Sequence, residues 1–357
     1  MTIANASDGA AHTAEKPCPM SYRPASMPRR RAIGMIFALV LLILLVTLSV
    51  MIGSKAIPLS VIWEAVFNPS DDIDQFSIRD YRLPRTGVGL CVGVALGTAG
   101  ALIQALTRNP LADPGILGVN AGASFFVAIG VTVFGVTSIQ GYVWFAFFGA
   151  LIVTVAVYVI GSAGRGGVDP VQLTLAGVAV GAVLGGIVTA MALLDPQAFD
   201  QMRNWNAGSV VGRGWNVLLP VLPFLVLGVF FAVIAVPALN SIALGDDLAR
   251  SLGANIIRTR ILVILAVTLL AGGATAIAGP IGFVGLMVPH IARWIVGPDQ
   301  RWIVAYTILL APCLVLAADI VGRVVIRPGE FPVGIVTAFV GAPVLIVLVR
   351  RKKASGL

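Results

Sequence analysis

Long apolar runs without charges, separated by short polar segments, dominate the chain. The first run covers 33–53, about the 20 residues that an α-helix needs to cross a bilayer. Nine more apolar stretches follow, at approximately 86–106, 115–135, 142–162, 171–194, 216–236, 261–280, 281–296, 302–322 and 333–349. Because only Gly279-Pro280 separates two of them, a count of nine or eleven is also open. The pattern predicts an all-α integral membrane protein with about ten transmembrane helices.

The two ends of the chain lack this pattern. Residues 1–32 are polar, contain four prolines and end in Arg29-Arg30-Arg31, which predicts a disordered N-terminal tail. Residues 33–351 then form one transmembrane domain, and 352–357 form a short C-terminal tail. Of 357 residues, 58% are hydrophobic and 11% charged, against roughly 25% charged in soluble domains. Composition therefore excludes an ordinary soluble protein.

The distribution of positive charge predicts the orientation. With the N-terminus inside, the inner segments carry roughly twice as many Lys and Arg residues as the outer segments, as the positive-inside rule requires. An even number of spans then places both termini in the cytoplasm. The net charge is +8, and the basic residues flank apolar segments without forming a stripe with interleaved aromatics. We therefore expect membrane lipid and no nucleic acid as a partner.

Residues with catalytic or metal-binding chemistry are scarce. The sequence has no Gly-rich phosphate loop, nucleophile elbow or HExxH pair. Its three cysteines are far apart, and neither His12 nor His290 has a second ligand at metal-binding spacing. We expect no enzyme, no catalytic residue, no metal site and no cofactor bound by this chain. No ionisable residue lies near the midpoint of a predicted span, although coupling to an ion gradient usually needs one.

The loop 237–260 contains a short amphipathic segment. Its leucines recur at helical spacing, two aspartates fall in the first turn where they complement the helix dipole, and Gly253 ends the helix. The apolar face consists of Leu244, Leu248 and Leu252. From the residues alone, such a helix is most often an anchor at the membrane surface.

Two further patterns concern packing. Gly97–Gly100 through Pro114–Gly118 resembles the segment from Gly272 to Gly285, which predicts inverted half repeats of about five spans each. Asp319 precedes Arg323 by one helical turn, the spacing of a structural ion pair.

Several long motifs, in the same order and spacing, resemble the FecCD-type permeases, the membrane subunits of type II ABC importers for siderophores, haem and cobalamin. The resemblance covers about 33–351. The motifs are Arg82-Leu-Pro-Arg85, Gln104-Ala-Leu-Thr-Arg-Asn-Pro-Leu-Ala-Asp-Pro-Gly-Ile-Leu-Gly118, the segment Leu244 to Gly253, Gly279-Pro-Ile-Gly-Phe-Val-Gly-Leu-Met-Val-Pro-His-Ile-Ala-Arg293, Ala318-Asp319 and Phe331-Pro-Val-Gly-Ile-Val-Thr-Ala-Phe-Val-Gly-Ala-Pro343.

The resemblance implies a permease in the bacterial inner membrane, paired with a second copy or a paralogue. Two ATPase subunits holding ATP-Mg would dock inside, and an extracytoplasmic binding protein would dock outside. It assigns ATPase coupling to Leu244, Gly245, Asp247, Leu248, Ala249, Leu252 and Gly253, with Ala249 allowing close approach. It assigns binding-protein docking to Arg82, Arg85 and Arg323, and the cytoplasmic gate to Asn109 and Leu111.

Each of these assignments has an alternative. The three arginines could extend along helix ends toward the membrane surface, and Asn109-Pro110 also fits a plain turn. The gate loop 164–170 departs from the Ser/Thr-rich form of some relatives. The alternative function is an ion-gradient-driven secondary transporter that works without an ATPase. The cargo is not specified by the sequence.

Overall fold

The computed structural model describes residues 27–53, 57–68, 72–163, 170–326 and 329–350, and every regular element in these ranges is helical. Most of both predicted tails, and most of the gate loop 164–170, lie outside the described residues. The long helices are α1 Met27–Met51, α4 Leu83–Thr107, α5 Val119–Thr132, α6 Ile139–Ser162, α7 Pro170–Leu194, α9 Trp215–Ile242, α11 Ile256–Ala278, α12 Val284–Val296, α13 Gln300–Val325 and α14 Val333–Arg350. The short elements are α2 Leu59–Phe67, α3 Ile73–Ser77, the π-helix η1 Ile78–Arg82, the 3₁₀-helix η2 Pro114–Leu117, α8 Pro196–Asn206 and α10 Asp246–Ser251.

Each predicted apolar stretch contains one long helix. Among the described residues, seven helices are long and apolar enough to cross a membrane, and three shorter apolar helices, α5, α12 and α14, accompany them. The break at Gly279-Pro280 is present, because α11 ends at Ala278 and α12 begins at Val284. The chain is therefore a multi-pass helical membrane protein.

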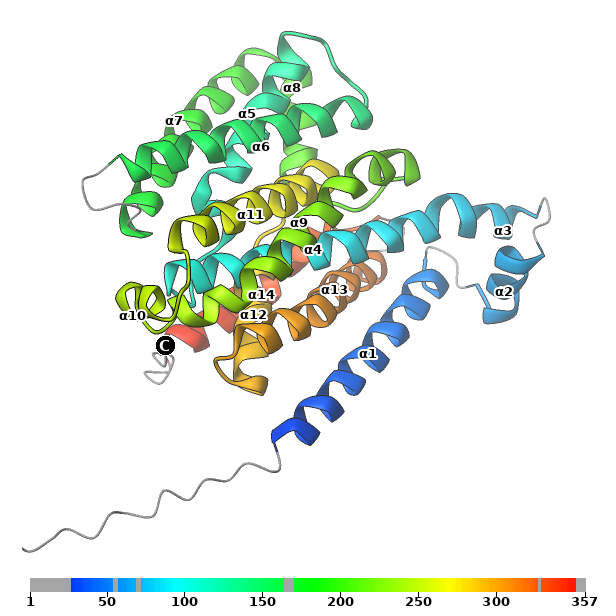
Figure 1. Cartoon of the computed structure of the whole chain (residues 1–357). Helices are drawn as coiled ribbons and strands as arrows, with labels where there is room; N and C mark the ends of the chain where they lie inside the picture. The colour runs from blue at the N-terminus through cyan, green and yellow to red at the C-terminus, as the bar shows by residue number, and fades with distance from the viewer. Residues whose placement is uncertain (1–26, 54–56, 69–71, 164–169, 327–328, 351–357) are drawn as a thin grey trace, which may run out of the picture.

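Helices α4 and α11 form the centre of the bundle (Figure 1). The most apolar window of each is 78% buried, whereas that of α1 is 17% and that of α7 is 11% buried. Close packing at the centre depends on small residues: a Cβ added to Gly100 of α4 would lie 1.8 Å from the carbonyl oxygen of Gly285 in α12. Such backbone contact is how helices associate in lipid, where apolar burial drives little.

The packing of the first half of the bundle has a counterpart in the second half. Helix α4 packs against α12 and α13, while α11 packs against α5 and α6. In the same way, α5 packs against α6 and α7, and α12 packs against α13 and α14. The contacts of α4 and α5 are thus repeated by α11 and α12, in agreement with the two half repeats expected from the glycine-rich segments.

Two helix boundaries differ from the sequence-based prediction. Helix α1 begins at Met27, so Arg29–Arg31 belong to it and not to the tail. Arg31 explains this: its Nη2 donates to Val296 O at 2.8 Å, and its guanidinium lies 5.6 Å from the centre of the Trp302 ring. Pro237 lies inside α9, which continues to Ile242, so the predicted loop starts later.

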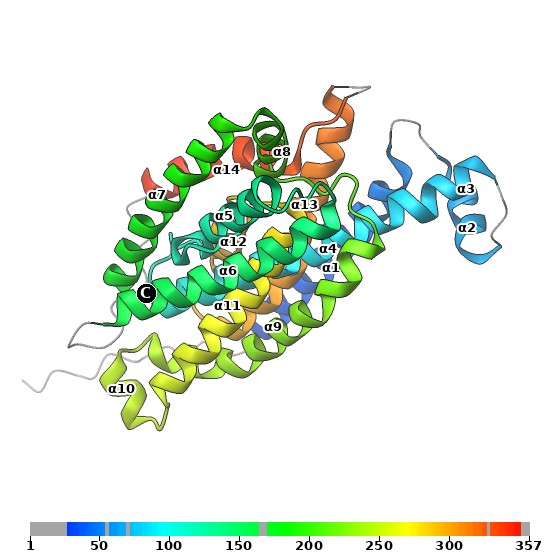
Figure 2. The ribbon, with the colours of Figure 1, turned by 90° about the horizontal axis from the view of Figure 1, so that it is seen from above.

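The bundle has two distinct ends, seen at opposite sides of Figures 1 and 2. We call the end that carries Arg82, Arg85 and Arg323 the arginine end, and the other the α10 end. Helix α4 joins them: Arg82 precedes its first residue, and Arg108, after its last, contacts Asp246 of α10. At ~1.5 Å per residue, the 25 residues of α4 separate the two ends by about 37 Å.

Candidate functional site

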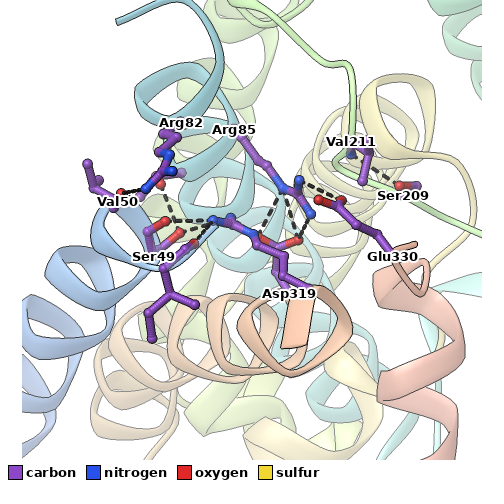
Figure 3. Close-up of polar contacts among 11 residues, drawn as sticks. Ser49, Val50, Arg82, Arg85, Ser209, Val211, Asp319 and Glu330 are labelled. Atoms are coloured by element: carbon purple, nitrogen blue, oxygen red, sulfur yellow. Dashed lines mark hydrogen bonds and ion pairs between the residues drawn. The ribbon is translucent and has the colours of Figure 1, made fainter. Parts of the chain in front are cut away.

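A buried ion cluster connects α4 with α13 at the arginine end (Figure 3). Asp319 and Arg323, one turn apart on α13, form an ion pair, and both side chains are almost completely buried. The second oxygen of Asp319 accepts a hydrogen bond from Arg85 Nη2 at 2.7 Å. Arg85 Nη1 also contacts Glu330 Oε2 at 2.8 Å, in the segment before α14. Two cations therefore share one buried carboxylate, and a second carboxylate closes the network.

Arg82 and Arg323 bind the end of α1. Arg82 Nη1 donates to Val50 O and Met51 O, both at 2.8 Å, and Arg323 Nη1 donates to Ser49 O at 2.6 Å. The last carbonyls of a helix have no intrahelical partner, and a cation there also complements the helix dipole. These two arginines therefore fix α1 to the rest of the bundle.

The three arginines predicted to dock the binding protein are all largely buried. Arg82 is 7% exposed and Arg323 is 2% exposed, so neither presents a free guanidinium at the surface. Arg85 is also mostly buried, and like Arg82 and Arg323 it lines a surface cavity of about 450 Å³. The charged residues lining this cavity are Asp80, Arg82, Arg85, Arg213, Arg323 and Glu330.

Arg213 is the charged residue of this cavity that the sequence did not single out. It precedes α9, it is 9% exposed, and its Nε forms no hydrogen bond within the described part of the chain. Burial lowers the pKa of this guanidinium to about 10, so it remains charged at neutral pH. Arg213 is therefore a desolvated cation beside the Arg85–Glu330 pair.

The α10 end exposes apolar side chains. Leu244, Leu248 and Leu252 are 62%, 49% and 60% exposed, on and beside the helix Asp246–Ser251. Asp247 is fully exposed and lies 3.6 Å from Arg250, one turn on. Ala249 is fully buried, because it faces α9 and α11, the helices that contact α10. Ala249 is therefore enclosed by its own chain, whereas the leucines of the predicted coupling set are exposed.

The predicted gate residues lie in the turn after α4. Leu111 N donates to Asn109 Oδ1 at 2.9 Å, and Ala112 N donates to Asn109 O at 3.1 Å. Both Asn109 and Leu111 are exposed. Asn109 thus holds the turn that presents Leu111, so the turn that the sequence also allowed is present.

The model of the FecCD transport family matches residues 41–351. The chain belongs to the FecCD transport family. The ferric enterobactin transport system permease protein FepD of Escherichia coli is 52% identical over 327 residues, covering 91% of this chain and 97% of that protein. The Fe(3+)-citrate import system permease protein YfmD of Bacillus subtilis is 38% identical, with 90% and 95% coverage.

A solved structure agrees with the family assignment. An inward-facing structure assigned to the metal-chelate type of ABC transporter superposes with a TM-score of 0.79 and 27% identity, covering 89% of this chain and 99% of that one. This FecCD chain therefore has the permease fold of ABC importers. It is a non-enzymatic transport subunit of the bacterial inner membrane, of the kind that serves iron complexes.

The structure brings some predicted site residues together and separates others. Arg82, Arg85, Arg323 and Asp319 lie together at one end, and the turn with Asn109 and Leu111 lies at the other end, where the preceding Arg108 contacts Asp246 of α10. Sequence reasoning missed Glu330 and Asp246 as contact-forming residues, and Arg213 as a residue that lines the cavity. Glu330 is 245 positions from Arg85, and no single-sequence pattern reports such a contact.

Proposed function

We propose that this chain is the permease of an ABC importer that moves a ferric siderophore from an extracytoplasmic binding protein into the cytoplasm. The observation that carries the proposal is the 52% identity, over nearly the whole chain, to a ferric enterobactin permease. The permease would act with a second permease subunit and with ATPase subunits that hold ATP-Mg. Both termini and α10 would face the cytoplasm.

The exposed leucines of the α10 end support the contact with an ATPase. Burying a leucine contributes roughly 1.5–3 kcal/mol, so leaving Leu244, Leu248 and Leu252 in water is unfavourable unless a partner covers them. Gly245 and Gly253 flank the helix, and no atom lies near the position of an added Cβ at either glycine. A partner can therefore reach the helix from the side that carries Leu248.

The cavity at the arginine end supports a docking role for a different set of cations. Arg85 and Arg213 line the cavity and would accept carboxylates of the binding protein, because guanidinium groups bind carboxylates with two parallel hydrogen bonds. Arg82 and Arg323 would act indirectly, by holding α1 in place. Complementary charge at such a surface raises the association rate more than the final affinity.

Transport would follow alternating access. ATP-driven closure of the ATPases would move α10, the turn carrying Asn109 and Leu111 would open or close the inner exit, and the cargo would pass between the two permeases. The pathway would bind the cargo weakly, because a tight site would retain it. Hydrolysis would take place wholly on the partner.

Reconstitution tests this function. Proteoliposomes would contain this permease with or without the ATPase and the binding protein, and would receive ferric catecholate, ferric citrate, haem or cobalamin. We expect uptake of a ferric siderophore that requires ATP, the ATPase and the binding protein. Uptake by the permease alone, driven by an ion gradient, would reject the proposal in favour of a secondary transporter.

A further inference from the structure

One carboxylate at the α10 end contacts two other parts of the chain. Asp246, the first residue of α10, forms an ion pair through Oδ1 with Arg108, which directly follows α4. Its Oδ2 accepts a hydrogen bond from Arg260 Nη2 in α11 at 2.8 Å. Each carboxylate oxygen of Asp246 thus has its own arginine partner. Arg108 lies beside the turn that follows α4, and Arg260 lies on the central helix α11.

Arg108 is held in an unusual backbone conformation. Its φ and ψ are 50° and 30°, the left-handed region that residues with a Cβ rarely adopt. From there its Nε donates to Ile242 O, the last residue of α9, at 2.9 Å. The next residue is Asn109, so the backbone of the turn carrying Leu111 starts at Arg108. Any displacement of the Arg108 guanidinium acts directly on this turn.

A glycine lies near each end of α10. Gly245 and Gly253 bound it with φ of 111° and 84°, values that favour glycine. The side chains of Asp246 and Arg108 are about one-third exposed, and ion pairs at this exposure contribute little to folding stability. We therefore expect the Asp246–Arg108 pair to matter more for connecting α10 with the turn after α4 than for folding stability.

We propose that Asp246 is a positioning residue that transmits movement of α10 to the turn carrying Asn109 and Leu111, through the guanidinium of Arg108. This inference rests on the proposed function, in which an ATPase moves α10. The contact between Asp246 and Arg260 has a different role: it keeps α10 oriented on α11, and the transmission of movement does not depend on it.

The test measures ATP hydrolysed per cargo molecule in the reconstituted complex. We expect Asp246→Asn and Arg108→Gln to raise this ratio by about 5-fold or more, the range of typical coupling between sites. We expect Arg260→Gln to change it by less than about 2-fold. Arg108→Lys keeps the charge but loses the two-donor geometry that reaches both Ile242 O and Asp246, so it should restore only part of the coupling. Asp200→Asn, in an exposed pair with Arg203 on α8, is the control for loss of an aspartate charge.

Thermal unfolding of each purified variant separates transmission from folding. If Arg260→Gln uncouples as strongly as Arg108→Gln, Asp246 merely anchors α10 and the proposal is overturned. Unchanged coupling in a folded Asp246→Asn or Arg108→Gln variant overturns it as well. The unsubstituted chain tests the proposed function separately. If it transports cargo without the ATPase, the proposed function is wrong. If its transport requires ATP and the ATPase but the variants remain fully coupled, only the inference about Asp246 is wrong.

Discussion

The two ends of the bundle differ in which side chains they bury: one buries charged side chains, and the other exposes apolar ones. At the arginine end, Asp319, Arg85 and Arg323 lie buried in one network, and the guanidinium groups of Arg82 and Arg323 hold the end of α1. At the α10 end, Leu244, Leu248 and Leu252 face the solvent, and the ion pairs of Asp246 are partly exposed. The first arrangement connects helices of the same chain, and the second leaves apolar side chains exposed.

Residue type alone therefore does not identify a docking surface. Arginines at a helix end suggest contact with a partner, yet Arg82 and Arg323 use their donors on carbonyls and a carboxylate of their own chain. Leucines suggest burial, yet those beside α10 are exposed.

The largest expected effect is on stability at the arginine end. Asp319→Ala leaves Arg85 and Arg323 buried without their shared counter-charge, and breaking a buried ion pair in this way costs about 3–5 kcal/mol. Thermal unfolding in detergent should show a large fall in Tm. Asp200→Ala, which removes an exposed pair, should cost less than about 1 kcal/mol. Equal losses in the two variants would contradict the assigned network.

The second expected effect is on partner binding at the α10 end. Leu248→Asp removes apolar contact worth roughly 1.5–3 kcal/mol, which corresponds to about 10- to 100-fold weaker binding of the ATPase. Stability should be unchanged, since Leu248 is half exposed. Affinity measured in reconstituted complexes checks this.

The matched control for Leu248→Asp is Tyr81→Asp, an exposed side chain at the arginine end. It should leave binding of the ATPase unchanged. If Tyr81→Asp weakens the ATPase complex as much as Leu248→Asp does, the contrast between the two ends is wrong.

A smaller effect is expected at Arg213. Arg213→Gln removes a cation from the cavity and should slow association of the binding protein by about 10-fold, because complementary charge acts mainly on the association rate. Stability should stay equal or rise, since Arg213 Nε is buried without a hydrogen bond in the described part of the chain, which is unfavourable. Stopped-flow association kinetics with the Arg203→Gln variant as control measures this, and a large fall in Tm with unchanged kinetics would count against a docking role.

Much of the fold could be predicted because hydrophobicity is a local property of the sequence. Each apolar stretch contains one long helix, and the leucine spacing located α10. The start of α1 could not be predicted, because Arg31 is stabilised by Val296 and Trp302 from distant helices. The inward orientation of Ala249 likewise depends on α9 and α11, which a repeat of leucines does not report.

Contacts of the candidate site likewise could be predicted only where the two residues are close in sequence. The Asp319–Arg323 contact is one helical turn apart, so its spacing predicts it. Arg85–Glu330 and Arg108–Asp246 join residues more than a hundred positions apart. Their formation depends on how the helices pack, and a single sequence does not contain that information.

Labelling of two engineered cysteines tests the central claim, that the α10 end and the arginine end face opposite sides of the membrane. In a chain with Cys18, Cys91 and Cys313 replaced by alanine, Leu248→Cys and Tyr81→Cys would each be exposed to a membrane-impermeant maleimide. We predict that Leu248→Cys reacts in inverted vesicles and that Tyr81→Cys reacts in spheroplasts. Reaction of both cysteines from the same side would contradict the account.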